Sequence, residues 1–345
     1  MGGKILITAR SFWRAEGLHP HLLRDAGYEL VAGNPDRPLR EEELLPLVHD
    51  VVAVILGVDP FTGDVMRRAP QLRVISRCGA GVDNVHVAAA TTLGIVVTNT
   101  PDANSISVAE LTMGLMLALA RAIPAQDRNV REGRWDRLPG AELQGQTLGL
   151  LGFGRIGREV ARRALAFGMQ IAYHDKAQPP GDLARSLGAR AMDRDDVLAT
   201  SDVVSLHLPL TAETRHIIDG RALKRMKPTA FLINTGRGGL VDEAALARAL
   251  KEGWIAGAAA DVFEREPPGP SPLFELASFI ASPHTGGVTR QSSLRMGLEA
   301  AKNALAVLSG ERPENVVNPE VYDHPRPIPE GAGGKRIRRP GRSDE

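Results

Sequence analysis

Short runs of apolar and β-branched residues alternate with longer, helix-length stretches from the first residues onward. These runs predict strands over 4–8, 29–32, 51–56, 73–77 and 95–99. Such alternation is typical of a parallel sheet wrapped by helices. Asn99, Thr100 and Pro101 then interrupt it, and a long apolar helix is predicted over about 104–121. The first part of the chain therefore predicts one α/β domain that ends near Pro101.

A second alternating series begins at Thr147. It predicts strands from Thr147 and over 171–174, 203–206, 230–233 and 255–260, with a short strand before Ser282 and a long helix over 289–308. No residue-level repeat links the two series, so we interpret them as two separate doubly wound α/β domains. We expect the last helix to return to the first sheet. The domains would then be 1–100 plus 289–321, which is discontinuous, and 101–288.

The composition supports this division and excludes several classes of protein. A length of 345 residues fits two domains, and 43% hydrophobic with 24% charged residues is typical of a globular chain. Because Lys and Arg total 42 against 41 Asp and Glu, charge gives no reason to expect a nucleic-acid partner. No apolar stretch approaches the ~20 residues of a membrane span. Residues 322–345, rich in Pro, Gly and Arg, predict a disordered basic tail.

A single cysteine, Cys78, cannot form an internal disulfide. This favours a reducing cytoplasm, and we expect Cys78 to be a small buried thiol. The N-terminal sequence MGGKILIT is interpreted as a first strand and not as a leader. His19 and His21 lack the spacing of helical metal ligands, so no metal site is predicted.

Chemistry is first indicated by the glycines of GFGRIG, residues 152–157, which lie between a predicted strand and a predicted helix. Glycines at this spacing permit a tight turn, close approach of a pyrophosphate to the backbone, and close helix packing. Asp175 ends the next predicted strand, where a carboxylate binds adenosine ribose hydroxyls and repels a 2′-phosphate. The segment predicts a Rossmann unit that prefers NAD to NADP.

Three further strand ends carry polar residues: Arg237 in NTGRGG, Glu266 in DVFEREP and His284 in SPHTGG. Ligands of open α/β sheets bind at such ends. A guanidinium can hold a substrate carboxylate, and an imidazole can exchange a proton with a hydroxyl near neutral pH. A carboxylate beside the imidazole would fix its tautomer. Each residue alone would more often be a surface ion-pair partner or a capping residue, but their shared position at the strand ends of one sheet favours a catalytic site.

The segments GAGVDN, NTP, AEL, GFGRIG, NTGRGGLVDEAAL, DVFEREP and SPHTGG occur in this order within about 4–321. Together they resemble the D-isomer-specific 2-hydroxyacid dehydrogenase family, in particular its phosphoglycerate dehydrogenase-like branch. The resemblance implies a flavodoxin-like substrate domain, a Rossmann NAD domain and a homodimer. It also implies hydride transfer between NAD and a small D-2-hydroxy or 2-keto acid, of the 3-phosphoglycerate or glyoxylate/hydroxypyruvate type. The alternative is an NAD(H)-sensing protein similar to transcriptional corepressors of the same fold, which turnover would exclude.

Residue by residue, the resemblance assigns catalysis to Arg237, Glu266 and His284. The implied cofactor contacts are Gly152, Gly154, Arg155, Ile156, Gly157, Asp175, Leu208, Pro209, Thr235, Gly236, Arg237, Asp261, His284 and Gly287. The implied substrate contacts are Arg77, Gly79, Ala80, Gly81 and Arg237. Leu56 is a departure, because phosphoglycerate dehydrogenases generally carry a phosphate-binding Arg there. Leu56 weakens the case for phosphate binding. Arg77 and Arg137 still match basic residues of those enzymes, so phosphate binding stays an alternative.

Overall fold

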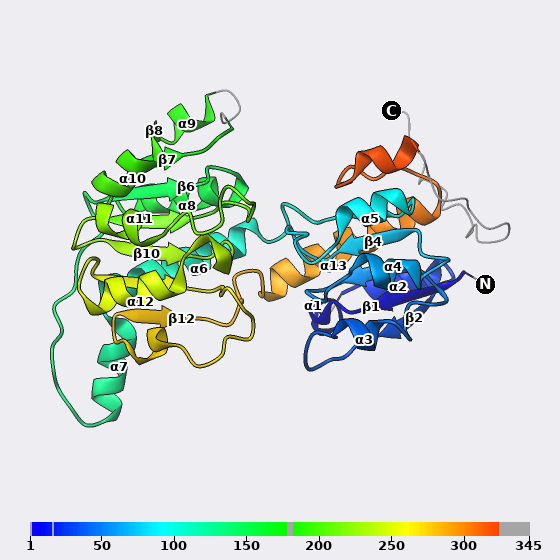
Figure 1. Ribbon diagram of the computed structural model, residues 1–345, viewed down its shortest axis with the longest axis horizontal. Helices are drawn as coiled ribbons and strands as arrows, with labels where there is room; N and C mark the ends of the chain where they lie inside the picture. The colour runs from blue at the N-terminus through cyan, green and yellow to red at the C-terminus, as the bar shows by residue number, and fades with distance from the viewer. Residues whose placement is uncertain (1, 16, 178–181, 324–345) are drawn as a thin grey trace, which may run out of the picture. The chain divides into compact units, whose positions relative to one another are not determined.

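The computed structural model describes residues 2–15, 17–177 and 182–323 (Figure 1). The chain divides into two compact units: unit 1 is Met1–Asn104 with Val288–Glu345, and unit 2 is Ser105–Gly287. Most of the expected basic tail lies outside the described residues. Its first two residues, Tyr322 and Asp323, belong to a 3-10 helix, η3 (Pro319–Asp323).

Unit 1 is built on five parallel strands in the order β2-β1-β3-β4-β5. These strands are β1 (Lys4–Ile7), β2 (Glu29–Ala32), β3 (Val51–Leu56), β4 (Val74–Arg77) and β5 (Val96–Thr98). The helices are α1 (Arg10–Arg14), α2 (His19–Asp25), α3 (Glu41–Leu44), α4 (Gly63–Arg67), α5 (Val87–Thr92) and α13 (Arg290–Leu308). One face of the sheet packs on α1, α2 and α13, and the other on α3, α4 and α5.

Unit 2 is built on seven parallel strands in the order β12-β11-β10-β9-β6-β7-β8 (Figure 1). They are β6 (Thr147–Leu151), β7 (Gln170–His174), β8 (Arg190–Ala191), β9 (Val203–Leu206), β10 (Phe231–Asn234), β11 (Gly257–Ala260) and β12 (Phe279–Ala281). The helices are α6 (Ser105–Ala120), α7 (Ile123–Arg131), α8 (Arg155–Ala166), α9 (Leu183–Ser186), α10 (Arg194–Thr200), α11 (Gly220–Arg225) and α12 (Glu243–Lys251). Two 3-10 helices, η1 (Gly238–Leu240) and η2 (Pro272–Glu275), follow β10 and β11.

Each face of the unit 2 sheet has its own core. Helices α6 and α8 cover one face, where Met113 and Met116 pack with Val160 and Ala164. Helices α10, α11 and α12 cover the other. All strands of both sheets are parallel, so their carboxyl ends share one edge of each sheet. The predicted fold class, two doubly wound parallel-sheet domains, is confirmed.

Two elements were missed by the hydrophobic pattern, and both are poor in buried residues. Helix α7 has the sequence IPAQDRNVR, which is mostly polar and buries none of its side chains, so its few apolar positions do not form the broad stripe of a core helix. Strand β8 is two exposed residues long. The strand expected over 255–260 begins at Gly257, because Ile255 and Ala256 belong to the preceding turn.

The long helix α6 is mainly a core element, with residues such as Val108, Thr112 and Met116 buried. Among the described residues, no single helix is long and apolar enough to cross a membrane. Helices α6 and α7 meet that test of length and composition only when joined across a 61° bend. Cys78 is buried and free, as expected, and burial raises the pKa of its thiol.

Candidate active site

The turn between β6 and α8 has the geometry that a dinucleotide requires. Gly152 has a left-handed φ of 98°, and a Cβ there would lie 2.6 Å from the backbone of His207. A Cβ on Gly157 would collide with the carbonyl oxygen of Gly152. At Gly154, in contrast, no heavy atom lies within 4 Å of the Cβ position. Two glycines are thus required by close packing, and the third leaves the helix N-terminus open to a phosphate.

Asp175 lies directly beside this turn. Its Oδ2 accepts a hydrogen bond from the Phe153 amide at 2.6 Å, and its Oδ1 accepts from the Ala177 amide at 2.9 Å. The carboxylate therefore has a fixed orientation at the end of β7. The glycine turn and the acidic residue together fit NAD. The turn suits the pyrophosphate, and Asp175 suits the ribose hydroxyls.

His207, which directly follows β9, packs against the glycine turn. Its Nε2 lies 2.9 Å from the Ser205 hydroxyl, its Nδ1 is buried, and its backbone contacts Gly152. Burial lowers the pKa of His207 to about 3, so the ring is neutral near pH 7. Leu208 and Pro209 follow it in the loop after β9.

Glu266 and His284 meet at the carboxyl edge of the same sheet. Nδ1 of His284 lies 2.6 Å from Oε2 of Glu266, and Oε1 of Glu266 accepts from the Phe263 amide at 3.0 Å. Burial would raise the pKa of Glu266. The hydrogen bond and charge of His284, the Phe263 amide and the charge of Arg237 outweigh burial and lower it. Glu266 is therefore an anion that fixes the orientation of the imidazole.

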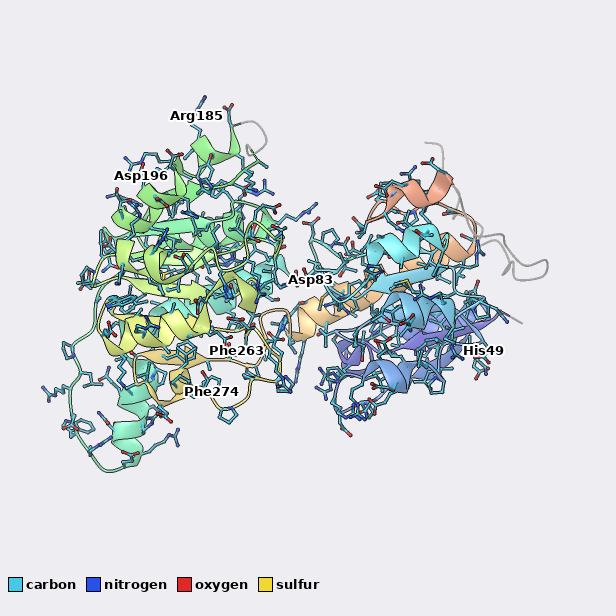
Figure 2. The ribbon with its side chains drawn as sticks, in the orientation of Figure 1. His49, Asp83, Arg185, Asp196, Phe263 and Phe274 are labelled. Atoms are coloured by element: carbon cyan, nitrogen blue, oxygen red, sulfur yellow. The ribbon has the colours of Figure 1, made fainter. Side chains whose placement is uncertain are left out.

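The loops that carry these side chains are held by aromatic and main-chain contacts. Figure 2 labels Phe263 and Phe274, whose rings pack edge to face at 5.6 Å. His284 adopts a left-handed φ of 53°, and its amide donates to the carbonyl oxygens of Asp261 and Ser282. Arg237 directs Nη1 to the carbonyl oxygen of Gly236 at 2.7 Å.

The remaining cofactor residues expected in unit 2 differ in their positions and in their contacts. Arg155 and Ile156 begin α8, and Gly287 ends the unit. The hydroxyl of Thr235 hydrogen-bonds at 2.8 Å with Thr112 of α6, so it faces the core helix. Asp261 is buried, and its carboxylate binds the turn that contains His284.

Sequence reasoning missed three side chains of this site: Thr112, His207 and Asn234. Asn234 is buried and hydrogen-bonds the turn that contains Gly236 and Arg237. The available signal was the Asn-Thr-Gly order at a strand end, because Asn commonly hydrogen-bonds the backbone two residues on. Thr112 lies in an apolar helix and carries no such signal.

The expected substrate loop, 77–81, belongs to unit 1. The Cys78 amide donates to the Leu56 carbonyl, the Gly79 carbonyl accepts from Thr100, and the Ala80 carbonyl accepts from Asn99. Gly79 has a φ of 149°, and a Cβ there would collide with the Arg77 guanidinium. The loop, which ends at Gly81, thus lies at the carboxyl ends of β3 and β4.

Leu56, at the end of β3, is fully buried in the unit 1 core. Arg137 is exposed in the segment after α7. Within the described parts of the chain, no three His, Cys, Asp or Glu side chains are grouped so that they could hold a metal ion.

Comparison with known proteins identifies the family. The model of the D-isomer specific 2-hydroxyacid dehydrogenase NAD binding domain matches residues 113–286. The chain belongs to the D-isomer specific 2-hydroxyacid dehydrogenase family. Within this family it is an NAD-dependent enzyme, in agreement with the glycine turn and with Asp175.

Two relatives indicate the range of named activities. The chain is similar to a glyoxylate reductase of Aeropyrum pernix, at 44% identity over 305 residues, 85% of this chain and 91% of that protein. It is 48% identical over 284 residues to a D-3-phosphoglycerate dehydrogenase of Methanocaldococcus jannaschii. That match covers 81% of this chain but only 54% of the relative, so the chain spans about half the relative's length.

The fold of the dehydrogenase is shared with solved structures. A D-lactate dehydrogenase of Aquifex aeolicus, solved as a complex with NAD and lactic acid, is similar at 28% identity with a TM-score of 0.81. The match covers 91% of this chain and 99% of that one.

Proposed function

We propose that this dehydrogenase reduces a small, unphosphorylated 2-keto acid of the glyoxylate or hydroxypyruvate type to the D-2-hydroxy acid. The observation that carries the proposal is the contact of 2.6 Å between His284 and Glu266 at the carboxyl edge of the NAD-binding sheet.

Each proposed catalytic group has a definite task. Bound NADH would supply the hydride that reduces C2 of the keto acid. Because Nδ1 of His284 is bound to Glu266, Nε2 is the ring nitrogen that gives its proton to the keto oxygen. Glu266 stabilises the imidazolium from the other side, and Arg237 binds the substrate carboxylate and polarises the keto oxygen. In the reverse direction, the neutral imidazole accepts the hydroxyl proton.

The remaining site residues are proposed in the roles that the family implies. The turn 152–157, Asp175 and the loops after β9, β10 and β12 would bind NAD. The loop 77–81 would bind the substrate carboxylate through its amides, which makes unit 1 the substrate domain. The expected boundaries, 1–100 plus 289–321 and 101–288, correspond to these two roles.

Leu56 supports an unphosphorylated substrate. A buried leucine offers a phosphate neither charge nor hydrogen bond, and burying a phosphate dianion without such partners is costly. A substrate of the 3-phosphoglycerate type is the alternative, because one relative carries that name.

The test compares glyoxylate, hydroxypyruvate and 3-phosphohydroxypyruvate with NADH in one assay. We expect the highest kcat/KM with an unphosphorylated acid. A preference for 3-phosphohydroxypyruvate would overturn the substrate assignment. NADH binding without turnover of any 2-keto acid would overturn the enzyme proposal itself and favour a sensor.

We also propose that the enzyme is a cytoplasmic homodimer. Helix α7 and the segment after it expose Ile123, Val130 and Trp135, and Trp135 is 76% exposed. Large apolar side chains exposed along one stretch of chain favour a protein partner, for which a second copy is the simplest choice. The free thiol of Cys78 supports a reducing compartment.

A further inference from the structure

Two buried polar side chains lie at neighbouring strand ends and hydrogen-bond the turns that carry proposed catalytic residues. Asn234 is the last residue of β10 and is 3% exposed. Asp261 directly follows β11 and is 1% exposed. The Asp261 amide donates to the Asn234 carbonyl at 2.9 Å, so the sheet holds the two residues in fixed register.

Asn234 holds the turn of Arg237. Its Nδ2 donates to the carbonyl oxygen of Arg237 at 2.9 Å, and its Oδ1 accepts from the Gly236 amide at 3.1 Å. The turn therefore needs one donor and one acceptor on the same planar group. Only an amide side chain of this length provides both.

Asp261 holds the turn of His284 with acceptors only. Oδ1 accepts from the Thr285 amide at 2.8 Å, from the Ser282 hydroxyl at 2.6 Å and from the Thr285 hydroxyl at 3.2 Å. Oδ2 accepts from the Gly286 amide at 2.7 Å. The Asp261 carbonyl also accepts from the His284 amide at 2.8 Å. His284 is not a glycine but has a left-handed backbone conformation. Such a conformation persists only where the surrounding contacts fix it.

We propose that Asn234 and Asp261 are paired positioning residues of the reaction: Asn234 fixes the backbone of Arg237, and Asp261 fixes the turn that presents His284. This inference rests on the proposed function. It changes the role of Asp261, for which the family resemblance implies a cofactor contact, because its oxygens bind the His284 turn.

The two residues offer opposite isosteric substitutions. Asn234→Asp keeps the acceptor for Gly236 but turns a carboxylate oxygen against the Arg237 carbonyl. Asp261→Asn turns an NH₂ group against an amide N–H of Thr285 or Gly286, whichever way the side chain is oriented. Asn234→Asp alters one contact and Asp261→Asn alters at least one, both at constant shape, and the double variant has the same charge as the natural protein.

Steady-state kinetics of the full-length enzyme with NADH and glyoxylate test the two roles separately. For Asn234→Asp we expect the KM for glyoxylate to rise at least tenfold, with a smaller change in kcat. For Asp261→Asn we expect kcat to fall ten- to a hundredfold, while the NADH Kd from fluorescence titration stays within threefold. A large loss of NADH affinity in Asp261→Asn would overturn the positioning role in favour of a cofactor contact.

A double-variant comparison identifies the residue through which Asp261 acts. Added to His284→Ala, Asp261→Asn should lower kcat no further, whereas independent effects would multiply and overturn the proposal. If Asp261→Asn fails to fold, Ser282→Ala replaces it, because it removes a single hydrogen bond from the turn. A kcat reduced severalfold at unchanged NADH Kd supports the role, and an unchanged kcat contradicts it.

A measurement without substrate separates this inference from the proposed function. In the unliganded protein with ¹³C-labelled histidine, the His284 ring signal is identified by its loss in His284→Ala. Asp261→Asn should shift or broaden that signal and leave the His21 signal in place. An unmoved His284 signal would contradict the inference even if the enzyme is active, and a natural protein without turnover would contradict only the proposed function.

Discussion

The tautomer of one imidazole decides what the proposed site can do. Glu266, an anion because its pKa is lowered, accepts from Nδ1 of His284 and so leaves Nε2 to exchange the substrate proton. Removing the negative charge while keeping the hydrogen bond should weaken the stabilisation of the imidazolium but not the orientation of the ring. Glu266→Gln makes that change.

For Glu266→Gln we expect kcat of keto-acid reduction to fall by about tenfold, because a hydrogen bond from a charged group to a carboxylate is worth about 1 kcal/mol more than one to a neutral amide. Glu264→Gln is the control, because Glu264 pairs with Arg215 and not with His284. Equal kcat values in the two variants would contradict the role of Glu266.

Asp175 should determine the choice of cofactor. A 2′-phosphate would lie beside a carboxylate that two backbone amides hold in place. Lys176, the residue after Asp175, lies near an acidic side chain of its own, Glu213. The Thr211 hydroxyl, a backbone hydrogen bond and the charge of Lys176 together lower the pKa of Glu213. We expect the natural enzyme to prefer NADH in kcat/KM.

The variants Asp175→Ala and Asp175→Asn separate charge from geometry. Both should reduce the preference for NADH over NADPH by roughly tenfold or more, about 1.4 kcal/mol for each factor of ten. Asp175→Asn keeps an acceptor for the Phe153 amide and should therefore retain more activity with NADH. Equal use of NADPH by the natural enzyme would show that another positive charge offsets Asp175.

Titratable residues at strand ends were the part of the candidate site that the sequence could predict. Arg237, Glu266 and His284 each follow a strand, and their motifs keep a fixed order along the chain. Asn234 and Thr112 could not be predicted in this way. Asn234 makes two hydrogen bonds to the turn that follows it, the Thr112 hydroxyl bonds to Val108 of its own helix and to Thr235, and no periodicity encodes such contacts.

At the level of elements, the glycine turn and the strand beneath it form one unit. The backbone of His207 lies against Gly152, and the ring edge lies near Gly157. A buried neutral imidazole is compatible with this packing, whereas a buried imidazolium is not. The turn should therefore lose stability when that ring is forced to take up a proton.

The pH dependence of stability tests this coupling. The pKa of His207 is about 3 in the folded chain, against 6.5 for an ordinary histidine. Below pH 6.5 only the unfolded chain takes up this proton, so the folded state loses about 1.4 kcal/mol per pH unit, or about 2 kcal/mol between pH 6.5 and 5. His207→Asn should abolish that part of the slope in urea unfolding. His21→Asn, an exposed histidine, is the control, and equal slopes in the His207 variant and natural protein would contradict the prediction.

The elements that bury a continuous apolar face were predicted within about two residues. Strands such as β3, VVAVIL, are buried at every position, and β-branched runs of this kind are typical of parallel sheets. Helix α7 and strand β8 bury no residue and contain few apolar positions, so the pattern typical of core elements does not predict them. The hydrophobic pattern of the sequence therefore does not predict elements that lie entirely on the surface.

At the scale of the whole molecule, the two units differ in how much chemistry they carry. Unit 2 supplies the glycine turn, Asp175 and the three proposed catalytic side chains. Unit 1 supplies the loop 77–81 and the end of β3, where Leu56 is buried in the core. Substrate choice is thus expected to follow unit 1, and exchange of Leu56 for Arg in a buried core would destabilise the fold before it created a phosphate site.

Helix α7 and the segment after it carry large exposed apolar side chains. Val130 is 58% exposed, Ile123 is 51% exposed and Trp135 is 76% exposed, although large apolar side chains gain roughly 1.5–3 kcal/mol each from burial. Pairing of two copies through α7 and the segment after it would bury them. Light scattering at micromolar concentration should therefore give twice the chain mass of 37.0 kDa. Val130→Glu with Trp135→Glu should lower the mass toward one chain, whereas Phe167→Glu, an exposed apolar residue at the end of α8, should not. A natural protein of single-chain mass would contradict the dimer.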